Sequence, residues 1–267
     1  MTMDIWSALI LGIIEGLTEF LPVSSTGHMI LMADLLNLSG DKVKTFEIVV
    51  QLGAVLAVAV LYWRKYVDML RNWKKGRSSA ARLSLVHLML AMIPAVVIGL
   101  ALHSLIKTYL FGSETVLIGL VAGGVLMIIA ERLGKKVTAE TVDDISYRQA
   151  FGIGLFQCLA LWPGFSRSGS TISGGMLLGT SQKAAAEFTF LVSVPIMFAA
   201  SGLDLYKSRE LLSIADTGFF LTGLASSFIV GLLAVVTFMK LIKKIRLSWF
   251  AYYRFVIAIL YFIFVVR

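Results

Sequence analysis

Apolar stretches long enough to cross a lipid bilayer occupy most of this chain. Because lipid offers no hydrogen-bond partners, a crossing backbone must satisfy its own N–H and C=O groups, and a helix does this within one segment. The composition agrees, since 58% of the residues are hydrophobic and 15% are charged, against about 25% charged in soluble domains. We therefore expect an all-α polytopic membrane protein. Six stretches are predicted to cross the membrane: roughly 46–63, 83–106, 115–130, 184–203, 217–239 and 247–266.

Two further apolar regions, about 4–37 and 149–180, are interrupted near their middles by polar residues. Proline explains each interruption, because Pro22 and Pro163 cannot donate a helix hydrogen bond and restrict the preceding residue. Each region is predicted to be a re-entrant helix pair, which enters the bilayer, turns at the polar motif and leaves on the same side. Ionisable groups and irregular backbone at that depth indicate a functional site.

Basic loops predict the orientation. The loops 64–82 and 240–246 are rich in lysine and arginine and should face the cytoplasm, so the count of spans places both termini outside. The first re-entrant pair would then open to the outside and the second to the inside. These loops also explain the net charge of +8, so we expect no nucleic-acid partner. One integral-membrane domain, 1–267, would thus contain two inverted repeats, about 1–130 and 149–267.

Each predicted repeat holds a re-entrant pair and three transmembrane helices. Internal similarity supports this duplication weakly: Glu47 follows Pro22 by 25 residues, and Glu187 follows Pro163 by 24. Inverted repeats of this kind bring helix ends together near the middle of the membrane, where their free N–H groups can hold an anion.

Two acids precede the first proline. Glu15 and Glu19 are one helical turn apart, so their carboxylates should share a face. Such close acids repel each other unless one is protonated or a cation lies between them. A hard divalent ion, Mg²⁺ or Ca²⁺, that also touches phosphate oxygens would remove the repulsion. The pair is therefore predicted to bind a divalent cation, with a helix-capping and packing role as the alternative.

Arg167 of the second motif is the expected phosphate ligand, because its planar guanidinium can bind two oxygens at once and keeps its charge. The alternative is an ion pair with Glu187 or Glu47 that only locks the helices together. Both roles are compatible if the acid releases the arginine to the substrate.

Hydroxyl groups are concentrated in both motifs. A serine becomes a nucleophile when a base lies close to it, and His28, three residues after Ser25, can exchange a proton there. Capping of the returning helix is the alternative role for about half of the hydroxyls. The candidates are Ser24, Ser25, Thr26, Ser166, Ser168, Ser170 and Thr171.

Two strings carry a family resemblance: Glu15-Gly-Leu-Thr-Glu-Phe-Leu-Pro-Val-Ser-Ser-Thr-Gly-His28 and Pro163-Gly-Phe-Ser-Arg-Ser-Gly-Ser-Thr171. They resemble the two signatures of the bacterial undecaprenyl-diphosphate phosphatases of the bacitracin-resistance type, and the likeness extends over the whole chain. It implies removal of the terminal phosphate from undecaprenyl diphosphate, which regenerates the lipid carrier of cell-wall synthesis and confers bacitracin resistance. It also implies a location in the bacterial plasma (inner) membrane.

The resemblance suggests a role for each candidate. Glu19, Ser25, His28 and Arg167 would be catalytic, with Ser25 the favoured nucleophile, and Glu15 would join Glu19 as the acidic pair. The residues expected to bind the diphosphate are Ser24, Thr26, Ser166, Ser168, Ser170 and Thr171.

The expected reaction is phosphoryl transfer in a site that faces outward. Ser25 would attack the terminal phosphorus, with Glu19 or His28 handling its proton, although direct attack by water fits the sequence nearly as well. The isoprenoid tail would lie in a lipid-facing groove. A secondary transporter or lipid flippase is the rival function, because inverted repeats and broken helices are typical of transporters. The sequence is compatible with a monomer and with a homodimer.

Overall fold

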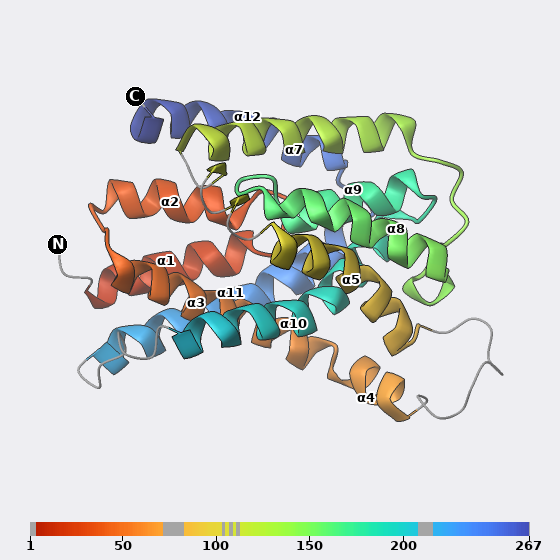
Figure 1. Ribbon diagram of the computed structural model, residues 1–267, viewed down its shortest axis with the longest axis horizontal. Helices are drawn as coiled ribbons and strands as arrows, with labels where there is room; N and C mark the ends of the chain where they lie inside the picture. Colours follow the sequence, from red (N-terminus) through yellow and green to blue (C-terminus); the bar gives the residue numbers. More distant parts are fainter. Residues whose placement is uncertain are drawn as a thin grey trace.

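The computed structural model describes residues 4–71, 83–102, 105–106, 109–110, 113–207 and 216–266. Regular structure in these ranges is helical, as predicted, apart from an isolated bridge between Ala139 and Thr180 (Figure 1). The α-helices are α1 (Ile5–Thr18), α2 (Ser25–Leu35), α3 (Asp41–Leu61), α4 (Trp63–Arg71), α5 (Leu85–Ala101), α7 (Ser113–Leu133), α8 (Tyr147–Gln157), α9 (Arg167–Leu177), α10 (Gln182–Lys207), α11 (Thr217–Leu241) and α12 (Leu247–Tyr261). Short helical turns occupy Val142–Asp144, Cys158–Leu161 and Phe262–Val266.

Apolar helices make this a polytopic membrane protein. Five segments in the described ranges are long and apolar enough to cross a bilayer, and they fall on five of the six predicted stretches: Lys42–Leu61, Glu114–Leu133, Gln182–Tyr206, Thr217–Leu241 and Leu247–Val266. The remaining stretch, 83–106, contains α5, which is shorter, at 17 residues. That stretch also extends into residues outside the described part of the chain.

The segment 64–82 corrects one prediction. It is predicted as a loop, but its first part belongs to α4, while residues 72–82 lie outside the described part. This helix is amphipathic, with Met69 buried and Arg64 exposed. A short helix of this kind can lie along a membrane surface, and its high charge makes it resemble a loop in sequence.

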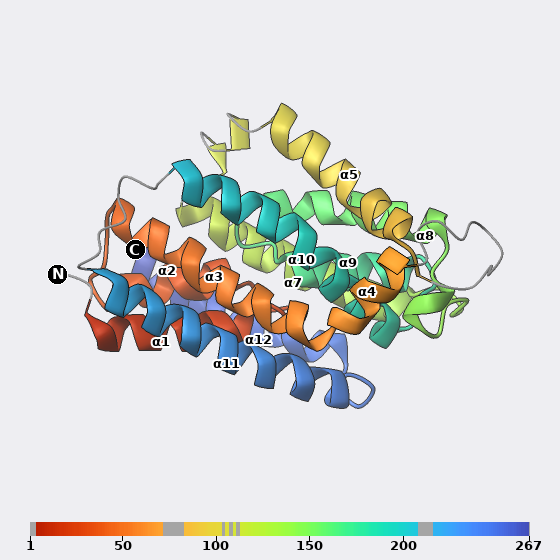
Figure 2. The ribbon, with the colours of Figure 1, turned by 90° about the horizontal axis from the view of Figure 1, so that it is seen from below.

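Each predicted re-entrant region forms a hairpin of two short helices, α1 with α2 and α8 with α9. Figure 1 shows the first hairpin at the end of the molecule that holds both termini and the second toward the opposite end. Figure 2 shows the turn between α11 and α12 at that opposite end as well. The two hairpin turns meet inside the molecule, where Ser168 Oγ donates a hydrogen bond to Leu21 O at 2.8 Å.

Both hairpins turn through a serine with an unusual backbone conformation. The φ angle is 72° at Ser24 and 75° at Ser166, a region that favours glycine. Each serine caps the helix that follows, since Ser24 Oγ accepts from Gly27 N at 3.4 Å and Ser166 Oγ accepts from Gly169 N at 3.1 Å. Such residues cost of order 1–3 kcal/mol and persist only where the surrounding structure holds them. The two motifs therefore share one local geometry.

Phe20 anchors the first turn in the core. Its side chain is fully buried, and its ring packs edge-on against Phe190 of α10 with centroids 5.3 Å apart. Phe20 directly follows Glu19, so the packing of this aromatic pair fixes the position of the acid. The same core cluster contains side chains of α3, α7, α10 and α11.

Pro195 lies inside α10 and removes one helix hydrogen bond. Without an N–H, it cannot donate to Leu191 O, four residues earlier. The hydroxyl of Tyr66 supplies the missing donor and reaches Leu191 O at 2.9 Å. This bond links α4 to the middle of α10 across the interior.

Replacing Tyr66 by phenylalanine is expected to lower the free energy of unfolding by about 1 kcal/mol, because Leu191 O loses its donor. Denaturant unfolding in detergent measures this change. In a Pro195→Ala background, residue 195 regains an N–H that can donate to Leu191 O, so the same Tyr66→Phe replacement should cost less. An equal cost in both backgrounds would contradict the assignment.

Candidate active site

The acidic pair lies at the end of α1, where the first hairpin begins its turn. Glu15 and Glu19 are 3% and 7% exposed, and their carboxyl groups are close enough to interact. Glu15 Oε1 is buried and has no hydrogen-bond partner among the described residues. An unpaired buried carboxylate oxygen is costly, so this atom indicates a place where a proton or a cation is expected.

Glu19 connects the two hairpins. Its Oε2 accepts a hydrogen bond of 2.6 Å from Ser25 Oγ, the first residue of α2. Its Oε1 forms an ion pair of 3.2 Å with Arg167 Nη2, the first residue of α9. One carboxylate thus holds the hydroxyl of the first motif and the guanidinium of the second, residues that lie far apart in sequence.

The ionic partner of Arg167 is Glu19, which is neither of the two acids considered for it in the sequence. Glu187 pairs instead with Lys65, with Oε1 and Nζ 2.6 Å apart. The Arg167 guanidinium also donates to Thr189 O at 3.4 Å and lies over the ring of Phe20, 5.8 Å from its centroid. The N–H groups of the Arg167 guanidinium therefore lie where the two hairpin turns meet.

The remaining hydroxyls of the second motif hold backbone atoms. Ser170 and Thr171 are buried, and both donate to Arg167 O, at 3.2 and 2.8 Å. Ser166 caps α9, and Ser168 reaches the first turn. In this arrangement the four hydroxyls brace the helix turn that carries Arg167. In the first motif, Ser24 caps α2, whereas Thr26 is exposed.

The ring nitrogens of His28 bond to groups other than Ser25, and one of these groups belongs to a residue that the sequence did not indicate. His28 Nδ1 donates to Ser24 O, and its Nε2 accepts from the hydroxyl of Tyr253, both at 2.8 Å. The two rings are stacked with centroids 5.6 Å apart. Tyr253 lies on α12, in an apolar span without a motif, so no local pattern indicated it.

The chemistry of the acidic pair fits a divalent cation. Magnesium commonly uses one or two carboxylates and takes its other ligands from water and phosphate, and Glu15 and Glu19 supply two carboxylates with one oxygen unpartnered. The described residues contain no group of three or more His, Cys, Asp or Glu side chains arranged for a metal. Further ligands would therefore be oxygen atoms of other kinds, such as those of water or phosphate.

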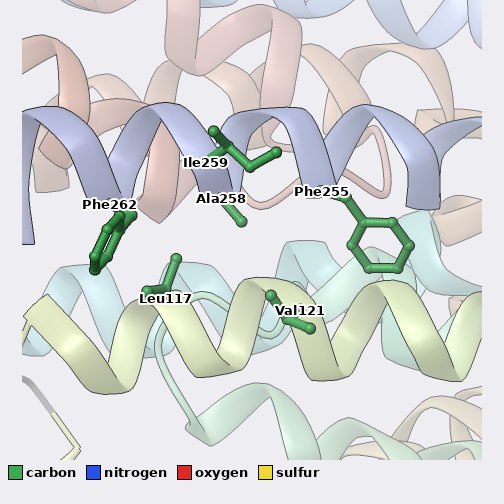
Figure 3. Close-up of a pocket in the computed structure, with 6 residues that line it drawn as sticks. All are labelled: Leu117, Val121, Phe255, Ala258, Ile259 and Phe262. Carbon is green, nitrogen blue, oxygen red and sulfur yellow. The ribbon is translucent and has the colours of Figure 1, made fainter.

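An apolar groove with a volume of about 500 Å³ lies between α7 and α12. Figure 3 shows Phe255, Ala258 and Phe262 extending toward α7, and Leu117 extending toward α12. The side chains that line the groove are Leu117, Val121, Phe255, Ala258, Ile259 and Phe262. A surface of this composition suits a hydrocarbon chain.

Fold and site together define a multi-pass membrane protein that gathers acid, hydroxyl and guanidinium groups at the junction of two buried turns. Residues 8–260 match the family model described as Bacitracin resistance protein BacA, and the chain belongs to this family. It is 55% identical, over 262 residues and 98% of each chain, to proteins named Undecaprenyl-diphosphatase 1 from Bacillus anthracis and from Bacillus thuringiensis subsp. konkukian. The protein of the same name from Bacillus cereus shows the same identity and coverage.

Proposed function

We propose that this chain hydrolyses undecaprenyl diphosphate to undecaprenyl phosphate and inorganic phosphate, with Glu19, Ser25 and Arg167 at the reacting centre. The observation that carries the proposal is the carboxylate of Glu19, which is bonded to both the Ser25 hydroxyl and the Arg167 guanidinium. Membership of the BacA family and the names of the relatives support the same activity. The product is the lipid carrier used again in cell-wall synthesis, and its recycling accounts for bacitracin resistance.

The reaction starts when the terminal phosphate competes with Glu19 for Arg167. Ser25 Oγ attacks the terminal phosphorus as its proton passes to Glu19 Oε2, and the bond to the bridging oxygen breaks to release undecaprenyl phosphate. Proton transfer removes the negative charge of Glu19, which weakens its hold on Arg167 and frees the guanidinium for the phosphoryl oxygens. Water then attacks the phosphoserine, and inorganic phosphate leaves as Ser25 recovers its proton.

The proton of Ser25 is assigned to Glu19 instead of to His28. Ser25 Oγ contacts Glu19, whereas both ring nitrogens of His28 bond elsewhere, to Ser24 O and Tyr253. The base for Ser25 is therefore Glu19. Most hydroxyls predicted to bind the diphosphate act by holding the turns that carry Ser25 and Arg167, namely those of Ser24, Ser166, Ser168, Ser170 and Thr171. Thr26 is exposed and is the one of this set assigned to direct contact with the diphosphate.

A divalent cation, Mg²⁺ or Ca²⁺, would be held by Glu15 and Glu19. When bound, it would neutralise phosphate charge and relieve the repulsion between the two acids. The unpartnered Oε1 of Glu15 is the structural support for this assignment. Arg167, on the second hairpin, would likewise neutralise phosphate charge.

Phosphate release from undecaprenyl diphosphate in detergent tests both proposals. Release is expected to stop in the presence of a chelator and to return with Mg²⁺ or Ca²⁺. Glu15→Gln should raise the cation concentration for half-maximal activity on the order of 10-fold or more, because one carboxylate charge is lost. Glu114→Gln, which alters an exposed acid of α7, is the matched control and should leave that concentration unchanged. Full activity in chelator would overturn the metal proposal alone.

The architecture proposed for this single domain, 1–267, is two inverted repeats, about 1–130 and 149–267, with six spans that include α5. The matching conformations of Ser24 and Ser166 support it. Helix packing supports it too: α1 lies against α11 and α8 lies against α5, which are equivalent pairs if the order of helices repeats. The charge of the loop 240–246 then places the second hairpin toward the cytoplasm.

The proposed location is the bacterial inner membrane, with the active site open to the outer, periplasmic side. The first hairpin, which carries Glu19 and Ser25, lies at the end that holds both termini (Figure 1), and this end is outside by the charge rule. The isoprenoid tail would extend over lipid-facing surface such as the groove between α7 and α12. A lipid transporter is the second candidate, favoured by the two opposed hairpins; a pure transporter would release no phosphate in the assay above.

A further inference from the structure

Arg254 of α12 is a buried guanidinium that the proposed reaction does not use. Its side chain is 0% exposed, and among the described residues no carboxylate pairs with it. A buried charge is expensive unless it is paired or hydrogen bonded. The hydrogen bonds of the Arg254 guanidinium therefore indicate which parts of the structure this residue stabilises.

The Arg254 guanidinium joins α7 to the turn of the second hairpin. On α7, Nε donates to Leu120 O and Nη2 to Gly119 O, both at 3.1 Å. On the turn, Nη2 donates to Gly164 O at 2.8 Å and Nη1 to Phe165 O at 2.9 Å. Four backbone carbonyl oxygens thus accept hydrogen bonds from one planar guanidinium. The ammonium group of a lysine cannot reproduce this geometry.

The turn lies directly on the backbone of α7. A Cβ atom added at Gly119 would overlap Pro163 O, and one added at Gly123 would overlap Phe165 O. Helices with glycine spaced four residues apart allow this kind of close approach. The turn is consequently held between the glycine face of α7 and the guanidinium of Arg254, with little room to shift.

We infer that Arg254 is a positioning residue for Arg167. Phe165, which Arg254 holds, is followed by Ser166, the N-cap of α9, and then by Arg167, whose guanidinium lies 3.2 Å from Glu19. Loss of the Arg254 bonds would release the turn and move Arg167 relative to Glu19 and Ser25. This inference rests on the phosphatase activity proposed above.

Kinetics of two variants in detergent test the inference. Arg254→Met is expected to lower kcat for phosphate release by about 100-fold, with KM changed by less than about 3-fold, because displacement of a catalytic group by about 1 Å costs that much. Arg254→Lys should fall between this variant and the unmodified protein. Ile257→Ala, which removes buried packing from the same helix, is the control and should retain most of the activity.

A double-mutant cycle separates positioning from a general effect on folding. If Arg254 acts through Arg167, Arg254→Met should cost less than about 10-fold when it is added to Arg167→Lys. An equal loss in both backgrounds, unchanged kcat in Arg254→Met, or an equal loss in Ile257→Ala would overturn the inference. If Arg254→Met does not fold, unchanged kcat in Arg254→Lys would overturn it. Absence of phosphate release from the unmodified chain would instead overturn the phosphatase proposal, and this inference with it.

Discussion

Replacing Arg167 by alanine is expected to lower kcat for phosphate release by about 10³-fold or more. The guanidinium is the one cationic side chain that contacts Glu19 among the described residues, and it lies where the two hairpin turns meet. Phosphoryl transfer depends on neutralising charge on the transferred group, and alanine removes that charge together with the fork of donors. Substantial remaining activity would show that Arg167 does not bind the phosphate.

Two further variants sharpen this result. Arg167→Lys keeps the charge but loses the paired donors, so its kcat should lie between those of the alanine variant and the unmodified protein. Arg148→Ala removes an exposed guanidinium from α8 in the same hairpin and should leave kcat unchanged. Thermal unfolding of Arg167→Ala should show a folded protein, because Glu19 keeps its hydrogen bond from Ser25.

Much of the fold follows from hydrophobic length and from two prolines. The long apolar runs predict α3, α7, α10, α11 and α12, because length and polarity alone decide whether a helix can cross a bilayer. Pro22 and Pro163, each followed by a run of Ser, Thr and Gly residues, predict the hairpins. Proline alone does not decide this, because Pro195 lies inside the continuous helix α10. Helix α4 was missed because a charged amphipathic helix and a charged loop have similar composition.

The candidate site was only partly predictable, because some of its residues lie in short motifs and others are brought in from distant parts of the sequence. Glu19, Ser25 and Arg167 belong to short polar motifs, so the sequence identified them and the structure brings them together. Tyr253 contacts His28 across 225 positions of sequence, and such a contact leaves no local pattern. Arg254 did leave a signal, as the single charged residue within the predicted span 247–266, and a charge at that depth should have been treated as functional.

Ser25→Ala is expected to lower kcat on the order of 10⁴-fold, because the nucleophile is lost while binding and charge stabilisation remain. Ser173→Ala is the matched control. Its hydroxyl is buried in α9 and finds no hydrogen-bond partner in the described part of the chain, so its removal should leave activity unchanged and stability unchanged or slightly higher. Phosphate release by the two variants and the unmodified protein, measured at the same cation concentration, gives the comparison.

A single-turnover experiment then decides between attack by Ser25 and direct attack by water. With substrate labelled at the terminal phosphate, acid quenching should trap a phosphoserine on the unmodified protein, located at Ser25 by mass spectrometry of the peptides. Ser25→Ala should show no labelled protein. If no phosphoserine forms and Ser25→Ala loses only about 10-fold in kcat, the serine merely orients Glu19 through its 2.6 Å hydrogen bond. Glu19 would then take its proton from water, and the phosphate would leave in one step.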